Sequence, residues 1–281
     1  MISRIAVLGA GTMGHGIAHA AITAGYETCL YDVSSEAIEK GRSAIESILG
    51  RAVDLGKMSG AHADATMQRL QGTDALAGAV EDCDFVIEAV PERIDLKIAL
   101  LTEVDQLVSA DTTIATNTSA LSITEIAGAT RHPPRVAGMH FFNPVHKMKL
   151  VEIVQALESS ASALRAVEEV ATRMGKETVL VRESPGFITS RVNATIGNEA
   201  FYMLMEGVAS ARDIDKALKL GLNHPMGPFE LVDLVGLDTR LNVLEYLHRS
   251  MGEKYRPCPL LVQYVKAGRL GRKAGRGVYD Y

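Results

Sequence analysis

The sequence predicts an α/β protein with a doubly wound, Rossmann-like and mostly parallel sheet, followed by an all-helical second domain. Three observations favour this fold class. Short apolar runs alternate with helical stretches up to about residue 184, a pattern typical of parallel strands that helices cover on both faces. The first of these runs leads into a glycine-rich turn. Beyond residue 184 no strand-like run appears until the terminal Val278-Tyr279.

The elements of the first domain follow in order. A strand, a turn and a helix are expected at the start, with the helix over residues 13–24, and a long amphipathic helix is expected over residues 34–55. Helices are also expected in most of the later gaps. The expected strands are short aliphatic or β-branched runs at residues 5–8, 28–31, 85–87, 113–115, 136–140, 150–154 and 178–181.

The segment Pro185-Gly186 interrupts this alternation. We therefore expect a boundary between a dinucleotide-binding domain of residues 1–184 and a helical domain of residues 185–281. The apolar stripes of the second domain must pack on each other, on the first domain or on a second subunit. Its expected helices span residues 188–206, 211–220, 229–251 and 260–265.

Composition and charge narrow the classes of function. Of 281 residues 47% are apolar and 22% are charged, as in soluble globular proteins. The net charge of −5 argues against a general electrostatic hold on nucleic acid or on an anionic membrane. Three widely spaced cysteines, Cys29, Cys83 and Cys258, argue against a disulfide framework and a metal cluster. The apolar run at the amino terminus is too short for a signal peptide or a membrane span, so we expect a cytoplasmic protein without a metal.

The glycine-rich turn has the spacing of a dinucleotide-binding fingerprint, after an expected strand and before an expected helix. Gly9 permits the tight turn, Gly11 lets a pyrophosphate approach backbone N–H groups, and Gly14 lets the helix pack near the strand. Asp32 follows at the end of the next strand, where its carboxylate can bind ribose hydroxyls and repel a 2′-phosphate, which favours NAD over NADP. A structural turn with Asp32 as a helix cap is the alternative. The residues of the turn are Gly9, Ala10, Gly11, Thr12, Met13 and Gly14.

A possible acid–base pair follows later in the chain. His140 ends an expected strand and Glu152 lies in the next one, and ligands of doubly wound sheets gather at the carboxyl ends of strands. Histidine is suited to exchange a proton near neutral pH, and a carboxylate on its second ring nitrogen would fix the tautomer. Taken singly, His140 could be structural and Glu152 an exposed strand residue. Together with a nicotinamide site they predict proton transfer.

Two further polar segments follow strands and leave their roles open. Asn117 and Ser119 could cap a helix or could present hydrogen-bond donors to a substrate oxygen. Glu88 and Glu92 flank a turn and could be solvated loop carboxylates or part of a site. The residue types alone do not choose between these interpretations.

Seven motifs together resemble the 3-hydroxyacyl-CoA dehydrogenase family, and within it the stand-alone bacterial 3-hydroxybutyryl-CoA dehydrogenases. The resemblance covers essentially the whole chain. It implies reversible NAD-dependent oxidation of an (S)-3-hydroxyacyl-CoA, with 3-hydroxybutyryl-CoA as the favoured substrate, to the 3-ketoacyl-CoA. In chain order the motifs are GAGTMGHGIA, IEAVPE, NTSALSI, HFFNPVHKMKLVEIV, SPGFI, LGLNHPMGPFELVDLVGLD and GRKAGRGVYDY.

The resemblance also implies roles for individual residues. His140 would remove the proton of the 3-hydroxyl group, Glu152 would orient His140, and Ser119 would bind the substrate oxygen. Asn143 would hold the substrate or the nicotinamide. The positions that would contact the cofactor, besides the glycine turn and Asp32, are Glu92, Lys97, Asn117, Ser119, Asn143 and Lys273.

Other substrate contacts follow from the same resemblance. Arg51 and Lys57 could meet the phosphates of CoA. Ser190 stands where the family usually has an asparagine that touches the substrate, so either the Ser190 hydroxyl takes that role or Asn193 does. A helical rise of about 1.5 Å per residue separates these two positions by about 4.5 Å along the axis, which favours Ser190.

The family's helical domain forms a dimer, so we expect a homodimer through residues 185–281. Two rival functions remain. A dehydrogenase of the same fold could act on a sugar acid or another 3-hydroxy acid without CoA. A non-catalytic NAD-binding protein would require loss of a catalytic group, but His140, Glu152 and Ser119 are all present.

Overall fold

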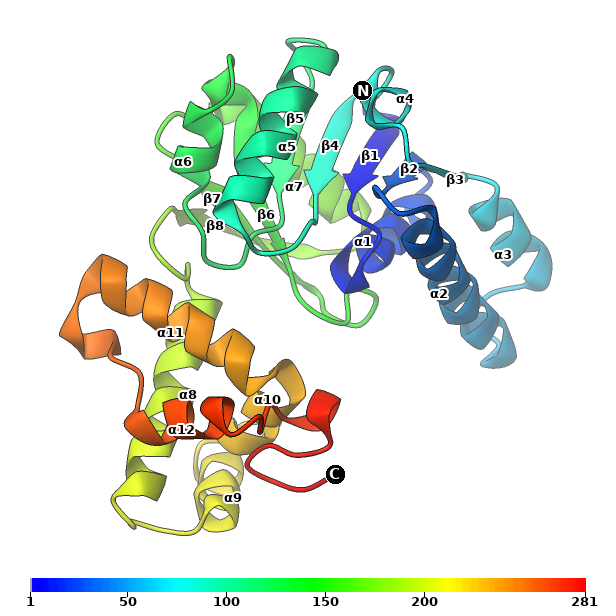
Figure 1. Ribbon diagram of the computed structural model, residues 1–281. Helices are drawn as coiled ribbons and strands as arrows, with labels where there is room; N and C mark the ends of the chain where they lie inside the picture. Colours follow the sequence, from blue (N-terminus) through cyan, green and yellow to red (C-terminus); the bar gives the residue numbers. More distant parts are fainter. Residues whose placement is uncertain (1) are drawn as a thin grey trace. The chain divides into compact units, whose positions relative to one another are not determined.

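The computed structural model describes residues 2–281, and the chain divides into two compact units, Met1–Glu183 and Ser184–Tyr281 (Figure 1). The first unit is built on one eight-stranded sheet with the order β3-β2-β1-β4-β5-β6-β7-β8. All neighbouring strands from β3 to β6 are parallel, β7 is antiparallel to β6, and β8 is parallel to β7. The strands are β1 (Arg4–Leu8), β2 (Glu27–Tyr31), β3 (Leu70–Thr73), β4 (Phe85–Glu88), β5 (Thr113–Thr116), β6 (Val136–Phe141), β7 (Leu150–Gln155) and β8 (Glu177–Arg182).

The change of direction at β7 follows from the short connection that precedes it. Residues 142–149 link β6 to β7, whereas a parallel crossover needs a dozen or more residues. The two strands therefore pair antiparallel, with His140 directly opposite Glu152. A connection of this length thus brings the two residues of the expected acid–base pair together.

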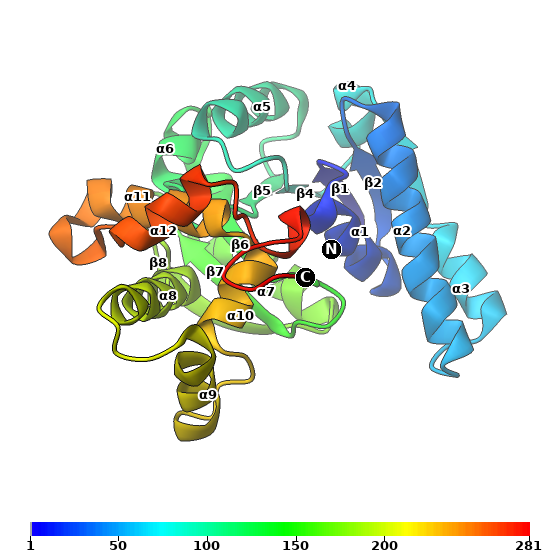
Figure 2. The ribbon, with the colours of Figure 1, turned by 60° about the horizontal axis from the view of Figure 1, so that its bottom comes forward.

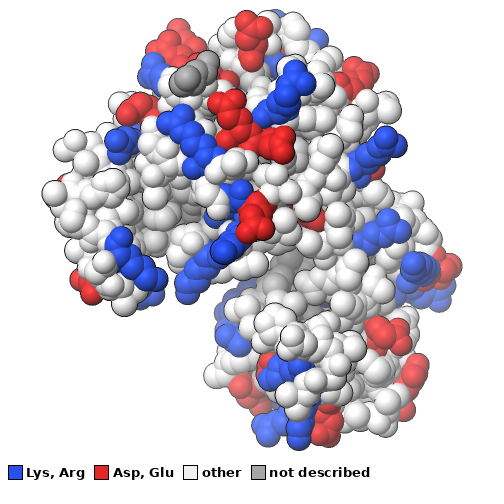
Figure 3. All heavy atoms as spheres, turned by 180° about the vertical axis from the view of Figure 1, so that it is seen from behind, with Lys and Arg blue, Asp and Glu red and all other residues white. Residues whose placement is uncertain are grey.

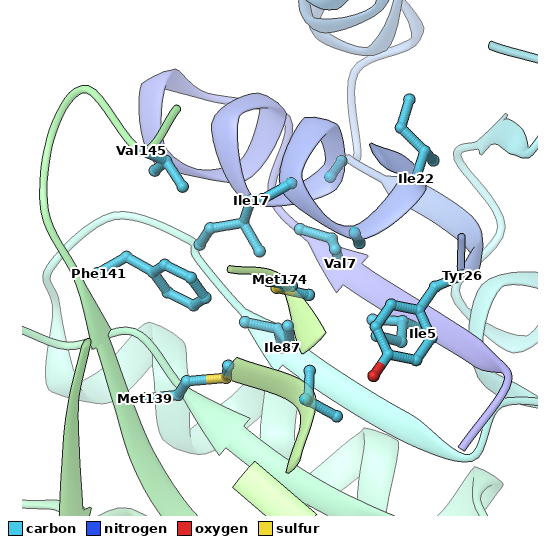
Figure 4. Close-up of a cluster of buried hydrophobic side chains, with 14 of the residues drawn as sticks. Ile5, Val7, Ile17, Ile22, Tyr26, Ile87, Met139, Phe141, Val145 and Met174 are labelled. Carbon is cyan, nitrogen blue, oxygen red and sulfur yellow. The ribbon is translucent and has the colours of Figure 1, made fainter. Parts of the chain in front are cut away.

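Helices cover both faces of this sheet, as Figures 1 and 2 show. The face that carries Ile5, Val7 and Ile87 packs against Ile17 of the first helix in a continuous buried cluster (Figure 4). This burial on two sides explains why β1 (RIAVL) and β6 (VAGMHF) are almost wholly apolar. The helices on that face are α1 (Thr12–Thr23), α2 (Ser35–Asp54) and α7 (Ala161–Arg173), and those on the other face are α4 (Leu76–Val80), α5 (Ile94–Leu107) and α6 (Ile123–Gly128), with η1 (Pro133–Arg135) before β6.

Two elements of the first unit, β3 and α3 (Gly60–Met67), are not predicted by the sequence patterns. The strand β3 has the sequence LQGT with one buried apolar residue, Leu70, and α3 buries only Ala63 and Thr66. Neither has the apolar periodicity from which elements are predicted. A Cβ atom at Gly72 of β3 would lie 2.5 Å from Ile38 Cγ2, so the edge strand meets α2 closely because this residue has no side chain.

The second unit is helical around a core that includes Phe201, Phe229 and Leu244. The rings of Phe201 and Phe229 meet edge to face with centroids 5.2 Å apart. The helix expected over residues 229–251 is wrong as a single element, because Gly236, with φ of +108°, separates two helices. The elements are α8 (Thr189–Met205), α9 (Ala211–Gly221), α10 (Pro228–Val235), α11 (Leu237–Met251), η2 (Glu253–Tyr255), α12 (Pro259–Lys266) and η3 (Arg272–Ala274).

The carboxyl-terminal tail is held by a buried carboxylate rather than by a strand at Val278-Tyr279. Asp233 of α10 accepts hydrogen bonds from the backbone N–H groups of Val278 and Tyr279 at 2.8 and 2.9 Å. A Cβ atom added at Gly271 would lie 2.3 Å from the carbonyl oxygen of Asp233. A Cβ atom added at Gly277 would lie 2.0 Å from Oδ1 of Asp233. These close approaches account for both glycines of the terminal motif.

Charged side chains of both signs are interspersed on the face of the molecule shown in Figure 3. No helix within residues 2–281 is both long enough and apolar enough to cross a bilayer.

Candidate active site

The glycine-rich turn joins β1 to α1, and each glycine has its own physical reason. Gly9 has φ of +103°, and a Cβ atom there would lie 2.8 Å from the Ala89 carbonyl oxygen. A Cβ atom at Gly14 would lie 1.6 Å from the Gly9 carbonyl oxygen. A Cβ atom at Gly11 would meet nothing within 4 Å among the described residues. The space in front of Gly11 and the first turn of α1 is therefore open, as a pyrophosphate bound at a helix N-terminus requires.

Asp32 lies at the carboxyl end of β2 and holds this turn in place. One carboxylate oxygen accepts a hydrogen bond from Ala10 N at 2.9 Å, and the other accepts one from Ser34 N at 3.1 Å. The cap of α2 is the Ser34 hydroxyl, which accepts from Ala37 N, so Asp32 is not needed as that cap. A carboxylate has about four acceptor sites, which leaves Asp32 able to accept hydrogen bonds from ribose hydroxyls as well.

The buried pair of His140 and Glu152 lies near the carboxyl end of β6, at the same edge of the sheet as the glycine-rich turn after β1. His140 Nδ1 is 2.7 Å from Glu152 Oε2, and the side chains are 7% and 0% exposed. The imidazole also contacts the ring of Phe142, with centroids 4.5 Å apart. A carboxylate at Nδ1 fixes the tautomer in which Nε2 accepts a proton, and its charge stabilises the imidazolium that then forms.

Ser119 lies in the loop after β5, and Glu92 from the loop after β4 binds that loop at several points. Glu92 Oε1 accepts hydrogen bonds from the Ser119 hydroxyl at 3.0 Å, from Ser119 N at 2.8 Å and from Thr118 Oγ1 at 2.7 Å. Thr118 is fully buried. The side chain of Glu92 thus fixes where the Ser119 hydroxyl lies.

Lys97 is 1% exposed and forms a buried ion pair beneath these loops. Its Nζ lies 2.7 Å from Glu88 Oε1 and 3.4 Å from Glu92 Oε2. The other oxygen of Glu88 accepts a hydrogen bond from Thr116 Oγ1 at 2.5 Å. Burial raises the pKa of Glu88, and Lys97 acts in the opposite direction. Glu88 is therefore a buried residue at the end of β4 and not a solvated loop carboxylate. The apolar run directly before it was the one signal available in the sequence.

Asn117 connects the Ser119 loop to the strand that carries His140. Its Oδ1 accepts a hydrogen bond from Phe141 N at 2.8 Å. The backbone pairing of β5 with β6 ends at Thr116 and Gly138, so the Asn117 side chain extends that pairing toward the end of β6. Asn143 follows two residues after Phe141, is exposed, and precedes a cis peptide bond to Pro144.

Five further expected residues lie outside the loops and strands that carry the contacts described above. Arg51, in the last turn of α2, and Lys57, after that helix, are both exposed. In the second unit Ser190 and Asn193 are half-buried in the first turns of α8. Lys273 forms an ion pair with Asp238 at 2.7 Å.

Comparisons with known proteins agree with this arrangement. The family model for the 3-hydroxyacyl-CoA dehydrogenase NAD binding domain matches residues 4–184, and the model for the C-terminal domain of the same family matches residues 186–281. The chain belongs to the 3-hydroxyacyl-CoA dehydrogenase family. Its glycine turn and Asp32 lie in the NAD-binding domain of that family, so NAD is the cofactor.

Individual relatives of the chain are similar over the full length. A probable 3-hydroxybutyryl-CoA dehydrogenase of Bacillus subtilis is 46% identical over 281 residues, which cover 100% of this chain and 98% of the relative. The 3-hydroxybutyryl-CoA dehydrogenase of Bradyrhizobium diazoefficiens is 40% identical, with 100% and 96% covered. The crystal structure of (S)-3-hydroxybutyryl-CoA dehydrogenase from Ralstonia eutropha superposes with a TM-score of 0.97 at 42% identity, with 100% and 99% covered.

Proposed function

We propose that this member of the 3-hydroxyacyl-CoA dehydrogenase family catalyses the reversible NAD-dependent oxidation of (S)-3-hydroxybutyryl-CoA to acetoacetyl-CoA. The buried pair of His140 and Glu152, on the sheet edge that also carries the dinucleotide turn, is the observation that carries the proposal. The names of the full-length relatives support the four-carbon substrate.

In this mechanism His140 is the general base. Nε2 of His140 takes the proton of the 3-hydroxyl group while the hydride leaves C3, and a C=O bond forms at C3. NAD, when held at the glycine-rich turn and Asp32, would supply the acceptor for that hydride. Glu152, at Nδ1 of His140, stabilises the imidazolium that results, and the imidazolium returns the proton in the reverse direction.

Ser119 binds the substrate oxygen in this proposal. Its hydroxyl donates to Glu92 in the structure, and on substrate binding it donates to the oxygen at C3 instead. Glu92 and Lys97 then act by fixing the loop of Ser119, in addition to the cofactor contacts that the family resemblance implies. Asn117 positions the end of β6 from the same loop.

The remaining assignments are part of the same proposal. Asn143 and Lys273 contact NAD, Ser190 contacts the substrate, and Arg51 and Lys57 meet phosphates of CoA. The exposure of Arg51 and Lys57 supports their contact with a large polar ligand.

The helical unit also supports a homodimer. Ile188, the residue before α8, and Val192, in the first turn of α8, are 50% and 53% exposed, and Leu220 of α9 is 76% exposed. Exposed apolar residues grouped on helices are typical of subunit interfaces. Light scattering should give twice the mass of one chain, and a monomer that remains fully active would contradict the assignment.

A reducing compartment such as the cytoplasm suits the three free cysteines.

Substrate comparison tests the proposal. The purified chain should oxidise NADH with acetoacetyl-CoA, with kcat/KM higher for the four-carbon 3-ketoacyl-CoA than for the eight- and sixteen-carbon ones, and it should leave free acetoacetate unreduced. Equal kcat/KM for free acetoacetate and acetoacetyl-CoA would instead favour a dehydrogenase of free 3-hydroxy acids.

A further inference from the structure

A group of basic side chains lies beside the start of α1, and none of its members has a role in the function proposed above. The histidine cluster, as we name it, consists of His15 and His19 of α1 and His146 of the loop between β6 and β7. The rings of His19 and His146 meet edge to face with centroids 6.2 Å apart. His15 Nδ1 lies 2.9 Å from the carbonyl oxygen of Gly11, so the cluster begins at the dinucleotide turn itself.

The fold holds the loop of His146 against α1. A Cβ atom at Gly16 would lie 3.0 Å from Val145 Cβ, so the loop packs on the helix at a residue without a side chain. Val145 is 2% exposed and belongs to the core of the first unit, beside Ile17 (Figure 4). Lys176 Nζ donates hydrogen bonds to the carbonyl oxygens of Val145 and Met148 at 2.5 and 2.9 Å. The position of the His146 loop is therefore fixed in advance of any ligand.

The electrostatic surroundings of the cluster are cationic. Burial, together with the positive charges of His146, Lys176 and His15, lowers the pKa of His19 to about 4. Burial also lowers the pKa of His146, and so do Lys147, Lys176, His15 and Arg51. These groups come from α1, from α2, from the β6–β7 loop and from the residue before β8. Every charged group that acts on the two imidazoles is thus positive, and a nearby anion would act in the opposite direction and raise both pKa values.

One atom of the cluster also lacks a partner. His19 Nδ1 is buried and has no hydrogen-bond partner among the described residues, a state that costs free energy unless a ligand or a water binds there. His146 and Lys147 are exposed, so an anion can reach them from solvent. Imidazole N–H and ammonium groups both donate to phosphate oxygens.

We propose that the histidine cluster, together with Lys147, is a phosphate-binding site that receives a phosphate group of the acyl-CoA during the reaction. The inference rests on the proposed function, because that function supplies a substrate that carries phosphate groups. The pyrophosphate of NAD(H) is the other source of the same chemistry. Binding of either phosphate should be accompanied by proton uptake, because the anion raises the pKa values that the cationic surroundings lower.

Replacing His146 tests the site by steady-state kinetics. In His146→Ala the KM for acetoacetyl-CoA should rise about tenfold, the loss expected for a hydrogen bond to a charged group, while kcat stays within about twofold of the wild type. The KM for acetoacetyl-pantetheine, which lacks the phosphates of CoA, should not change. His132→Ala is the matched control, because His132 is an exposed histidine at the opposite, amino-terminal end of β6, and its KM values should equal those of the wild type.

Calorimetry provides a readout that does not depend on activity. Titration of CoA in two buffers of different ionisation enthalpy should show proton uptake near pH 7 with the wild type and less uptake with His146→Ala, whereas pantetheine should show none. If His146→Ala instead weakens NADH binding and leaves CoA binding unchanged, the site binds phosphate but the source is the cofactor. Unchanged affinities for both CoA and NADH would overturn the inference. A wild-type chain that cannot reduce acetoacetyl-CoA would contradict the proposed function separately from these binding results.

Discussion

Replacement of Lys97 by methionine tests the buried ion pair beneath the candidate active site. The Lys97 ammonium group lies 2.7 Å from Glu88 Oε1, and the two side chains are 1% and 0% exposed. Methionine leaves the Glu88 carboxylate buried without a cation. Removing one partner of a buried pair costs about 3–5 kcal/mol. Since a domain of this size loses about 2–4 °C per kcal/mol, we expect Tm to fall by roughly 6–20 °C.

The same variant should gain a pH dependence of stability. Burial raises the pKa of Glu88 above its ordinary value of 4.5, and Lys97 opposes that shift in the wild type. Without Lys97 the folded protein retains a proton that the unfolded chain releases, so the free energy of unfolding is largest at low pH. The free energy of unfolding of the variant then falls as the pH rises above 4.5 and passes through the raised pKa of Glu88 in the folded protein.

Urea unfolding followed by circular dichroism at several pH values measures both effects. The double variant Glu88→Gln/Lys97→Met carries neither charge, so it should recover part of the lost free energy of unfolding and lose the added pH dependence. If Lys97→Met unfolds at the wild-type urea concentration and its stability does not change with pH relative to the wild type, the buried pair does not stabilise the fold as argued.

Three further predictions concern the cofactor, the substrate and the tail. Because Asp32 offers acceptors to ribose hydroxyls, kcat/KM should be much higher with NADH than with NADPH, and Asp32→Ala should weaken NADH binding more than NADPH binding; equal use of both cofactors by the wild type would contradict this. Ser190→Ala should lower kcat/KM several-fold, as expected for a lost hydrogen bond of about 0.5–1.5 kcal/mol, and Ser190→Asn should remain active. If Ser190→Ala leaves kcat/KM unchanged and Asn193→Ala lowers it, the substrate contact belongs to Asn193, one helical turn later, and not to Ser190. Gly277→Ala places a Cβ atom 2.0 Å from Asp233 Oδ1 and should lower Tm. Gly221→Ala is the control, because Gly221, like Gly277, has no positive φ and a Cβ atom there would meet nothing within 4 Å among the described residues. Equal Tm values for the two variants would show that the close approach is unimportant.

The strands that are buried on both faces could be predicted from the sequence, because their apolar runs are the direct result of that burial. The β3 strand could not, since an edge strand with the sequence LQGT buries one apolar side chain. The break at Gly236 also escaped prediction, because α10 and α11 carry apolar residues on both sides of it and only the positive φ separates them. Apolar patterns in the sequence therefore predict which strands and helices are buried, but they do not predict where the backbone changes direction between two apolar helices.

The sequence predicted His140 and Glu152 as a pair, but it did not predict the partners of the other candidate site residues. The pairing of His140 with Glu152 depends on the antiparallel register of β6 and β7, which a sequence pattern does not show. The bonds from Glu92 to the Ser119 loop join residues from different strand ends. The motif resemblance supplied roles for these residues, whereas the structure supplied the contacts from which their cooperation is argued.

The central claim is that His140 transfers the proton in an NAD-dependent oxidation of 3-hydroxybutyryl-CoA. The most direct test compares kcat for acetoacetyl-CoA reduction by wild type and His140→Ala, with NADH affinity measured by fluorescence on the same two proteins. Loss of a general acid or base typically lowers the rate by about 10²- to 10⁴-fold. We expect a fall of that size with unchanged NADH affinity, and near-wild-type turnover by His140→Ala would contradict the claim.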